Sequence, residues 1–448
     1  MKYVLRVVCY TQHIHIRHIY MTECWSDPGF CLVAVQYRGS YLKYVEHQTP
    51  EICRAAVQND PTSLQFVQDQ TDEICVLAIQ KDMDGEAIKH VRNLTNELCV
   101  RAIETCGGDV LHEIPIGMHT PELCRMAVLS DPWALGACSE DAQTFELCLL
   151  AFRKQASTIS VVKKQSPELC MAAVQQSGLA IVDIHEDYRT HDVCLAAVKN
   201  DGNALRHVSP KEQTLDICLA AVKQNGLALN HIHSMRHHTR EVHLAAVNQN
   251  GCAIELFLDP ADWPGPPEWL DELYLAAVRQ NGMVLDAVPQ TDEVRFAAVQ
   301  QNGMALKFVD VIHQTHTLCL SAVKQNGLAL QYISRDMHDD YDLCIAAVSQ
   351  NGLALRYVRK PTPGMCLAAV MQNGMVLEHI PDENKTEPIC MGAVLQDGHA
   401  LQFVKSPTLN ICIQACRQNR NALRYVHDPG MHAPCLQRIS EGRENFSA

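Results

Sequence analysis

The chain has 448 residues, 47% of them apolar, which is enough to build a core and excludes a wholly disordered protein. Lys and Arg total 37 against 51 Asp and Glu, giving a net charge of −14, so a polyanion is a poor default partner. No apolar run approaches the roughly 18 residues of a membrane span, and the first residues lack the cleavage site of a signal peptide.

A repeat of about 24 residues runs along the chain, and its most regular position is a cysteine. Fifteen of the eighteen equivalent positions are Cys, so fifteen of the 21 cysteines occupy one place in the repeat. This column is Cys31, Cys53, Cys75, Cys99, Cys124, Cys148, Cys170, Cys194, Cys218, His243, Tyr274, Arg295, Cys319, Cys344, Cys366, Cys390, Cys412 and Cys435. The chain is long, its cysteine count is odd and it has no C-x-x-C pair, so we predict buried, reduced thiols that act as small apolar side chains.

Each repeat begins with the signals of a helix start. A Thr or Ser often stands four residues before the Cys and is followed by Pro and Glu, as in Thr49-Pro50-Glu51, Thr120-Pro121-Glu122 and Ser166-Pro167-Glu168. Thr or Ser at the N-cap, Pro at the first helical position and an acid in the first turn are typical of helix N-termini. The apolar stretch that follows predicts a helix buried on most of its sides.

Gln-Asn-Gly ends this helix seven times, at Gly226, Gly251, Gly282, Gly303, Gly327, Gly352 and Gly374. We predict that the glycine supplies a left-handed residue after the last helical turn. A strand hairpin, which Asn-Gly also favours, conflicts with the helical periodicity before it. A second apolar segment follows, such as Ala228, Leu229 and Ile232, and its spacing suits a short helix.

These elements predict an all-α fold, an α-solenoid of about 18 helical-hairpin repeats, with a leucine-rich-repeat-like solenoid as the alternative. In chain order we expect an N-terminal cap with a degenerate first repeat (1–30), the first half of the array (31–257), a Pro- and Trp-rich insertion (258–273), the second half (274–435) and a C-terminal tail (436–448).

The recurrent pattern C-L-A-A-V-x-Q-N-G-x-A-L-x-x-V resembles the short helical repeat known as domain of unknown function 4116. It is clearest in residues 194–208, 218–232, 319–333, 344–358 and 366–380, and weaker copies cover most of the chain from about residue 20. Tyr274 and Arg295 depart from the pattern. The resemblance implies tandem arrays of a kind met in large DNA viruses, amoeba-associated bacteria and protists. It implies no established activity.

A column of rings and imidazoles lies just before the last apolar residue of the second segment. Equivalent positions line up in a solenoid, so this column predicts a ladder beside a mildly basic polar column. The ladder is His18, Tyr44, Phe66, His90, His207, His231, Phe308, Tyr332, Tyr357, His379, Phe403 and Tyr425, and the polar column includes Arg356 and Arg424. Three interpretations remain open: packing between short helices, a groove for a protein or peptide, and single-stranded nucleic acid, which the net charge disfavours.

The insertion at residues 258–269 carries Trp263 and Trp269 among several prolines. We expect a stiff, non-helical segment. It is either folded back on the solenoid or serves as a partner-docking loop or a hinge between residues 1–257 and 270–448.

Features of an enzyme are missing from the sequence. It has no Walker A, H-E-x-x-H or G-x-S-x-G motif, and its histidine clusters lack the paired ligands of a structural zinc site, so we expect no catalysis, cofactor or metal. A cysteine-dependent enzyme would need one of the six thiols outside the column. These are Cys9, Cys24, Cys106, Cys138, Cys252 and Cys416.

We therefore expect a non-catalytic scaffold that binds a protein or peptide. The candidate residues are Tyr44, Phe66, Phe308, Tyr332, Tyr357, His379, Phe403, Tyr425, Arg356, Arg424, Trp263 and Trp269. We expect a cytoplasmic location, in the host cytoplasm if the protein is viral or a secreted effector. The alternatives are an architectural or nucleic-acid-associated protein and the cysteine-dependent enzyme.

Overall fold

The computed structural model describes residues 23–257 and 266–444, and every regular element in them is an α-helix or a 3-10 helix. The predicted all-α solenoid is confirmed. The leucine-rich-repeat alternative is wrong, because that repeat needs a β-strand and none of the described residues lies in one. The chain forms two compact units, residues 1–212 and 213–448.

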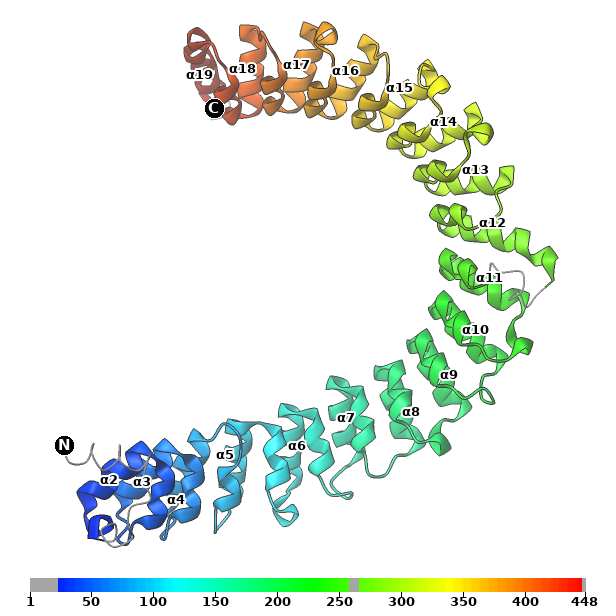
Figure 1. Cartoon of the computed structure of the whole chain (residues 1–448). Helices are drawn as coiled ribbons and strands as arrows, with labels where there is room; N and C mark the ends of the chain where they lie inside the picture. Colours follow the sequence, from blue (N-terminus) through cyan, green and yellow to red (C-terminus); the bar gives the residue numbers. More distant parts are fainter. Residues whose placement is uncertain (1–22, 258–265, 445–448) are drawn as a thin grey trace, which may run out of the picture. The chain divides into compact units, whose positions relative to one another are not determined.

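The first unit alternates α-helices with 3-10 helices (Figure 1). Its α-helices are α2 (Pro28–Tyr37), α3 (Pro50–Asn59), α4 (Asp72–Lys81), α5 (Asn96–Cys106), α6 (Pro121–Ser130), α7 (Phe145–Lys154), α8 (Pro167–Gln176) and α9 (His191–Asn200). Its 3-10 helices are η1 (Glu23–Ser26), η2 (Gly39–Tyr44), η3 (Pro61–Phe66), η4 (Ala87–His90), η5 (Gly108–Glu113), η6 (Ile116–Met118), η7 (Pro132–Ala137), η8 (Ala156–Val161), η9 (Gly178–Asp183), η10 (Glu186–Tyr188) and η11 (Gly202–His207).

The second unit follows the same plan. Its α-helices are α10 (Leu215–Gln224), α11 (Arg240–Gln249), α12 (Leu270–Gln280), α13 (Asp292–Gln301), α14 (His316–Gln325), α15 (Tyr341–Gln350), α16 (Pro363–Gln372), α17 (Glu387–Gln396), α18 (Leu409–Gln418) and α19 (Pro429–Glu444). Its 3-10 helices are η12 (Gly226–His231), η13 (Met235–His237), η14 (Gly251–Phe257), η15 (Pro267–Trp269), η16 (Gly282–Asp286), η17 (Gly303–Phe308), η18 (Val311–His313), η19 (Gly327–Tyr332), η20 (Arg335–Met337), η21 (Gly352–Tyr357), η22 (Gly374–His379), η23 (Asp382–Asn384), η24 (Gly398–Phe403) and η25 (Arg420–Tyr425).

One repeat is an α-helix followed by a 3-10 helix, so the short helix predicted for the second segment is present and is of the tighter 3-10 type. Within each unit an α-helix packs against the next α-helix, and its 3-10 helix packs against the next main 3-10 helix. The core lies between these two layers. In the α14 repeat it contains Leu318, Ala322, Val323 and Leu330, all at most 5% exposed.

The helix starts are built as predicted. The Thr120 hydroxyl accepts a hydrogen bond from the backbone N–H of Leu123 at 3.2 Å, and Ser166 caps Leu169 in the same way at 3.3 Å. Pro at the first helical position follows both caps. Thr therefore recurs because it satisfies an N–H group that the helix itself leaves without a partner.

The role predicted for the glycine of Gln-Asn-Gly is wrong. Among the described residues only Gly85 and Gly107 have a positive φ, so none of the seven Gln-Asn-Gly glycines adopts the left-handed conformation. The preceding Asn is extended, with φ −147° and ψ 109° at Asn326, and the glycine begins the 3-10 helix. Glycine is required by close approach, because a Cβ on Gly327 would lie 2.2 Å from the carbonyl oxygen of Ala347 in the next α-helix.

The cysteine column is buried, as predicted, and it has a polar function that the sequence did not reveal. The Cys344 thiol donates to the carbonyl oxygen of His338 at 3.2 Å, and the Cys148 thiol donates to that of Gln143 at 3.7 Å. One of the substituted repeats keeps such a bond, since the guanidinium of the buried Arg295 donates to the carbonyl oxygen of Gln290. The column therefore favours a small side chain that is also a weak donor.

Two other predicted segments are described only in part. Trp263 lies outside the described residues. Trp269 is half-buried at the end of η15, directly before α12, and its backbone N–H donates to the carbonyl oxygen of Pro266 at 3.2 Å. The expectation of a non-helical insertion is therefore wrong for residues 267–269, which form a 3-10 helix. The helix α19 extends to Glu444, so most of the expected tail at residues 436–448 continues a helix.

Candidate functional site

In many consecutive repeats, a side-chain amide forms hydrogen bonds to the backbone of the preceding repeat. None of the sequence predictions includes this contact. In the second unit the Gln that ends one α-helix reaches back to the preceding repeat. The Gln325 side chain accepts from the N–H of Gly303 at 2.7 Å and donates to the carbonyl oxygen of Gln301 at 3.2 Å. We call this pair of bonds the glycine clasp. It satisfies one donor and one acceptor that the ends of the two helices leave without a partner.

A second amide acts at the opposite end of the repeat, five residues before the Cys column. The Nε2 atom of Gln314 donates to the carbonyl oxygens of Val309 and of Tyr332 in the next repeat, at 3.2 and 2.9 Å. Its Oε1 atom accepts from the N–H of Ser334 at 2.8 Å. We call this the loop clasp. The repeated Gln before the Thr N-cap was the sequence signal that could have revealed it.

The predicted ladder residues end successive 3-10 helices, so the structure places them at one repeated position. Tyr44, Phe66, Phe308, Tyr332, Tyr357, His379, Phe403 and Tyr425 are the last residues of η2, η3, η17, η19, η21, η22, η24 and η25. The next residue of each of these repeats is a Val or Ile, which is buried in all of them except the half-buried Val404. In the second unit the last six form an uninterrupted series.

The ladder is neither core nor fully exposed. Tyr44 is 50% exposed and His379 is exposed, whereas Phe66, Phe308, Tyr332, Tyr357, Phe403 and Tyr425 are half-buried. Cations of the polar column lie over several of these rings. The Arg356 guanidinium lies 4.6 Å from the Tyr357 ring centroid and the Arg424 guanidinium 4.7 Å from that of Tyr425, with both arginines exposed.

Clasps fix the backbone of the ladder. The carbonyl oxygens of Phe308, Tyr332 and Phe403 accept hydrogen bonds from Gln290, Gln314 and Lys385. Side-chain contacts between repeats also occur, since the Tyr357 hydroxyl donates to Gln331 at 3.3 Å. The rings therefore stand on a stiff frame and take part in packing between repeats.

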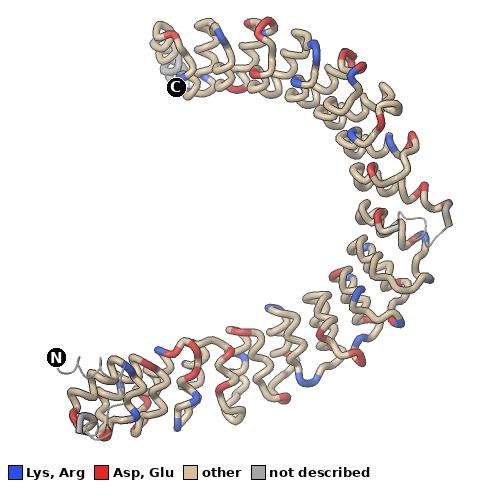
Figure 2. The backbone as a smooth tube through the Cα atoms, viewed as in Figure 1, with Lys and Arg blue, Asp and Glu red and all other residues tan. Residues whose placement is uncertain are grey.

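The polar column is only mildly basic. In the second unit it reads Lys307, Gln331, Arg356, Glu378, Gln402 and Arg424, so its three cations alternate with neutral or acidic side chains. Figure 2 shows charges of both signs interspersed along the backbone. This distribution is poor for tracking a phosphate backbone.

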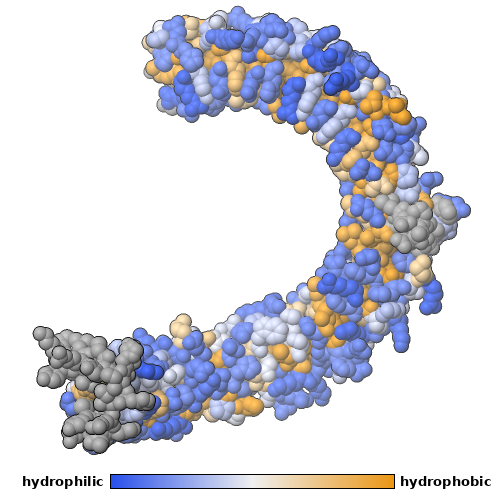
Figure 3. Space-filling model, in the orientation of Figure 1, coloured by the Kyte–Doolittle hydropathy of each residue, from blue (hydrophilic) through white to orange (hydrophobic). Residues whose placement is uncertain are grey.

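Exposed apolar side chains also gather on α16 and α17. Leu367, Met371 and Leu395 are 40%, 62% and 55% exposed. A Cβ on Gly392 would be 3.5 Å from both Leu367 and Met371, so these two helices meet there. Apolar side chains surface between polar ones in this part of the second unit (Figure 3). None of the sequence predictions covers this patch.

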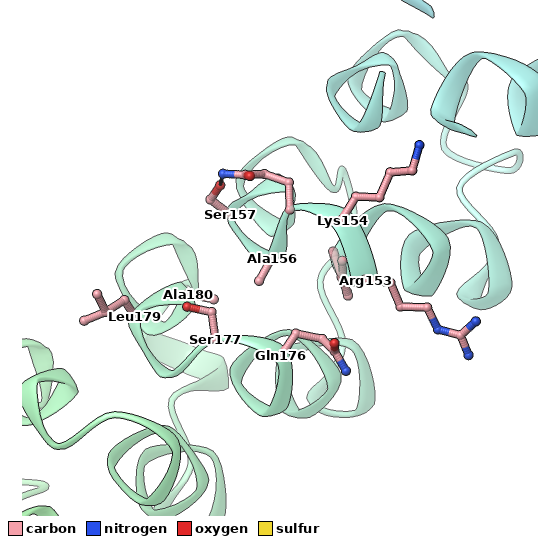
Figure 4. A pocket seen from close by; sticks show the side chains of 10 residues that line it. Arg153, Lys154, Ala156, Ser157, Gln176, Ser177, Leu179 and Ala180 are labelled. Atoms are coloured by element: carbon pink, nitrogen blue, oxygen red, sulfur yellow. Dashed lines mark hydrogen bonds between the residues drawn. The ribbon is translucent and has the colours of Figure 1, made fainter. Parts of the chain in front are cut away.

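A hollow of about 320 Å³ lies between the α7 and α8 repeats, lined by residues that include Ala156, Gln176, Ser177 and Leu179. Ala156 stands where most repeats have glycine, and its Cβ points toward the hollow, while Arg153 and Lys154 extend away from it (Figure 4). Among the described residues Gln176 forms no hydrogen bond to Ala156, although Gln at this position forms the clasp elsewhere. The hollow is therefore a junction without its glycine clasp.

Four of the six thiols outside the column have described side chains. Cys9 and the side chain of Cys24 lie outside the described part. Cys138 and Cys416 are buried, and burial raises the pKa of the Cys416 thiol to about 12. Burial also raises the pKa of Cys106, and Cys252 is half-buried. In the column, a hydrogen bond from Cys138 lowers the pKa of Cys124, but this thiol is fully buried.

The described residues contain no group of three or more His, Cys, Asp or Glu side chains that could hold a metal ion. The sequence has two histidine clusters, of which one, His13, His15 and His18, lies outside the described part. In the other cluster His238 and His243 lie with ring centroids 5.4 Å apart, and burial lowers the pKa of both imidazoles. No described helix has the length and apolarity needed to cross a membrane.

The fold and these repeated contacts define an all-α tandem-repeat protein. The family model for domain of unknown function 4116 matches residues 166–212 in the first unit and residues 214–259 and 317–360 in the second. The predicted resemblance is confirmed. No curated protein matches the chain.

Proposed function

We propose that the protein is a non-catalytic scaffold that binds an extended peptide segment of a partner protein along the ladder of the second unit. The observation that supports this most is the uninterrupted series from Phe308 to Tyr425, in which six repeats present a ring or an imidazole at one position. An extended peptide could place successive side chains between such rings. Affinity would come from a few partly buried rings, with the clasped backbone reducing the entropy lost on binding.

The half-buried state of the rings favours this function over packing alone. A ring that served only as core would be buried like the neighbouring Val309 or Ile333, which are each 4% exposed. The mixed charge of the polar column favours a peptide over nucleic acid. We further propose a reducing compartment inside a cell, because the column cysteines fill small buried positions in the core of the repeats.

A peptide library displayed on phage tests the proposal with the full chain as bait. The binding of a selected synthetic peptide is then measured by fluorescence anisotropy for the wild type and for the Tyr332→Ala/Tyr357→Ala/Phe403→Ala variant. The matched control is Phe296→Ala/Tyr341→Ala, which removes rings that are 39% and 56% exposed on α13 and α15. Circular dichroism must show that all three chains are folded.

We expect the ladder variant to lose binding and the control to retain it. Equal binding by both variants would contradict a ladder-bound peptide. A steep loss of affinity with added salt, together with binding of single-stranded oligonucleotides, would favour the nucleic-acid alternative instead.

A further inference from the structure

Seven Asn-Gly pairs stand at the junctions between α-helices and 3-10 helices of the second unit: Asn225-Gly226, Asn250-Gly251, Asn281-Gly282, Asn302-Gly303, Asn326-Gly327, Asn351-Gly352 and Asn373-Gly374. Asn-Gly is the dipeptide in which an asparagine side chain cyclises most readily, because glycine has no Cβ to hinder attack by its own backbone nitrogen. Seven such pairs in one unit would make an unprotected chain chemically unstable.

Both groups that must react are held by other bonds. At the α14–η19 junction the N–H of Gly327 donates to the Oε1 atom of Gln350 at 2.6 Å, and the Oδ1 atom of Asn326 accepts from the N–H of Leu328 at 3.0 Å. Gly327 is itself buried. The glycine nitrogen must lose its proton and turn toward the side-chain carbon of Asn326, and these bonds oppose both changes.

The same protection covers all seven sites. Each glycine N–H donates to the Gln of the following repeat, at distances from 2.5 Å for Gly226 to 2.8 Å for Gly352. The protecting group is therefore never part of the repeat that it protects.

We propose that these seven asparagines are latent deamidation sites, each kept unreactive by the glycine clasp of the following repeat. When a clasp opens, the glycine nitrogen gives its proton to hydroxide and bonds to the asparagine Cγ atom. The Cγ–Nδ2 bond then breaks, the nitrogen takes up a proton and departs as ammonia, and the product is a succinimide ring. Water then opens the ring at Cγ to give aspartate or at the backbone carbonyl to give isoaspartate, so the net reaction consumes one water and releases one ammonia.

The two products have different consequences for the fold. Aspartate already stands before the glycine in two repeats, where Asp201 and Asp397 accept from the N–H groups of Asn203 and His399, each at 2.9 Å. Isoaspartate adds a methylene to the backbone and would displace the glycine from its close contact with the next α-helix. The space around this glycine is small, because a Cβ on Gly327 would lie 2.2 Å from the Ala347 carbonyl oxygen. An opened junction that forms isoaspartate could not close again in the same way.

Peptide mapping by mass spectrometry tests this on the full chain aged in mildly alkaline buffer. Succinimide, aspartate and isoaspartate are quantified at every Asn-Gly pair in the wild type, in Gln350→Ala and in Gln350→Glu. We expect all seven sites to react slowly in the folded wild type and rapidly in urea. In Gln350→Ala, Asn326 should react about tenfold faster than in the folded wild type.

Internal controls make the result specific. Asn225 and Asn373, whose clasps are intact in Gln350→Ala, should keep the wild-type rate. Gln350→Glu should protect Asn326, because a carboxylate oxygen still accepts from Gly327. In Gln372→Ala the acceleration should move to Asn351, since Gln372 accepts from the N–H of Gly352.

Three results would overturn the proposal. They are equal rates in the folded and unfolded wild type, an unchanged rate at Asn326 in Gln350→Ala, and equal acceleration at all seven sites in a variant whose circular dichroism is native.

Discussion

The side chain of Gln350 accepts a hydrogen bond from the N–H of Gly327 at 2.6 Å and donates to the carbonyl oxygen of Gln325 at 3.3 Å. One amide thus binds the end of an α-helix and the start of a 3-10 helix in the preceding repeat. The two repeats can approach this closely only because Gly327 has no side chain, so the clasp requires the glycine.

Gly327→Ala should destabilise the second unit by about 3 kcal/mol, because its Cβ would overlap the Ala347 oxygen and force α15 away from η19. Urea unfolding followed by circular dichroism measures the loss. Gly364→Ala is the matched control, since its Cβ would meet only the Thr362 hydroxyl at 4.0 Å in the first turn of α16. The control should be neutral or slightly stabilising. Equal destabilisation by both would contradict the close-approach explanation.

Ala156→Gly should allow α8 to approach and Gln176 to form the missing clasp. The gain in stability is partly offset because glycine loses more backbone entropy on folding than alanine. We therefore predict the coupling energy between positions 156 and 176 and not the net change in the free energy of unfolding. A double-mutant cycle with Gln176→Ala should give a coupling of about 1 kcal/mol. The same cycle with Gln155→Ala should give none, since the Gln155 amide donates to Ser157 in its own repeat. Zero coupling with Gln176 would show that the alanine does not cause the open junction.

Thr362→Ala should destabilise the α16 repeat by about 1 kcal/mol, because the Thr362 hydroxyl caps the N–H of Met365. Thr386→Ala at the start of α17 should have a smaller effect, since Thr386 makes no side-chain cap bond. Both values come from urea midpoints. A larger effect at Thr386 would mean that the hydroxyl stabilises the helix start in some other way.

Alkaline pH should destabilise the fold through the cysteine column. Burial raises the pKa of Cys194, Cys218, Cys319 and Cys344 to about 11, from an ordinary value of 9.0. Between these values the folded chain binds more protons than the unfolded chain, so the free energy of unfolding falls as pH rises. The stabilising contribution is complete below 9.0 and is lost as pH rises through about 11.

Urea midpoints at neutral pH and at about pH 10 measure this loss. Cys218→Ala/Cys319→Ala should show a shallower dependence on pH than the wild type. An identical dependence would assign the alkaline loss to other groups, such as lysine or tyrosine side chains.

The helix starts and the cysteine column could be predicted because their signals are local. Thr120 and its cap partner Leu123 are three residues apart, and the burial of Cys319 follows from the apolar stretch around it. The glycine clasp could not be found in this way. Gln350 and Gly327 are 23 residues apart, and the fit between them depends on how two repeats pack. Local rules instead suggested a left-handed glycine.

The ladder shows the same limit. Its alignment follows from the period of the sequence, and the structure places Tyr332 and Tyr357 at equivalent helix ends. How far each ring is exposed depends on the neighbouring repeat, as the bond from Tyr357 to Gln331 shows. The 3-10 form of the second element was also hidden, because an apolar spacing of three residues is compatible with both helix types.

The glycine clasp makes it possible to add whole repeats to the array by tandem duplication. A segment running from one Thr N-cap to the next brings a glycine for the repeat after it and a Gln for the repeat before it. A tandem duplication between α13 and α14 would therefore supply both halves of its new contacts, with no compensating change elsewhere. The chain can therefore lengthen by whole repeats. Arg420 replaces the glycine after α18, so the series of clasped glycines ends there.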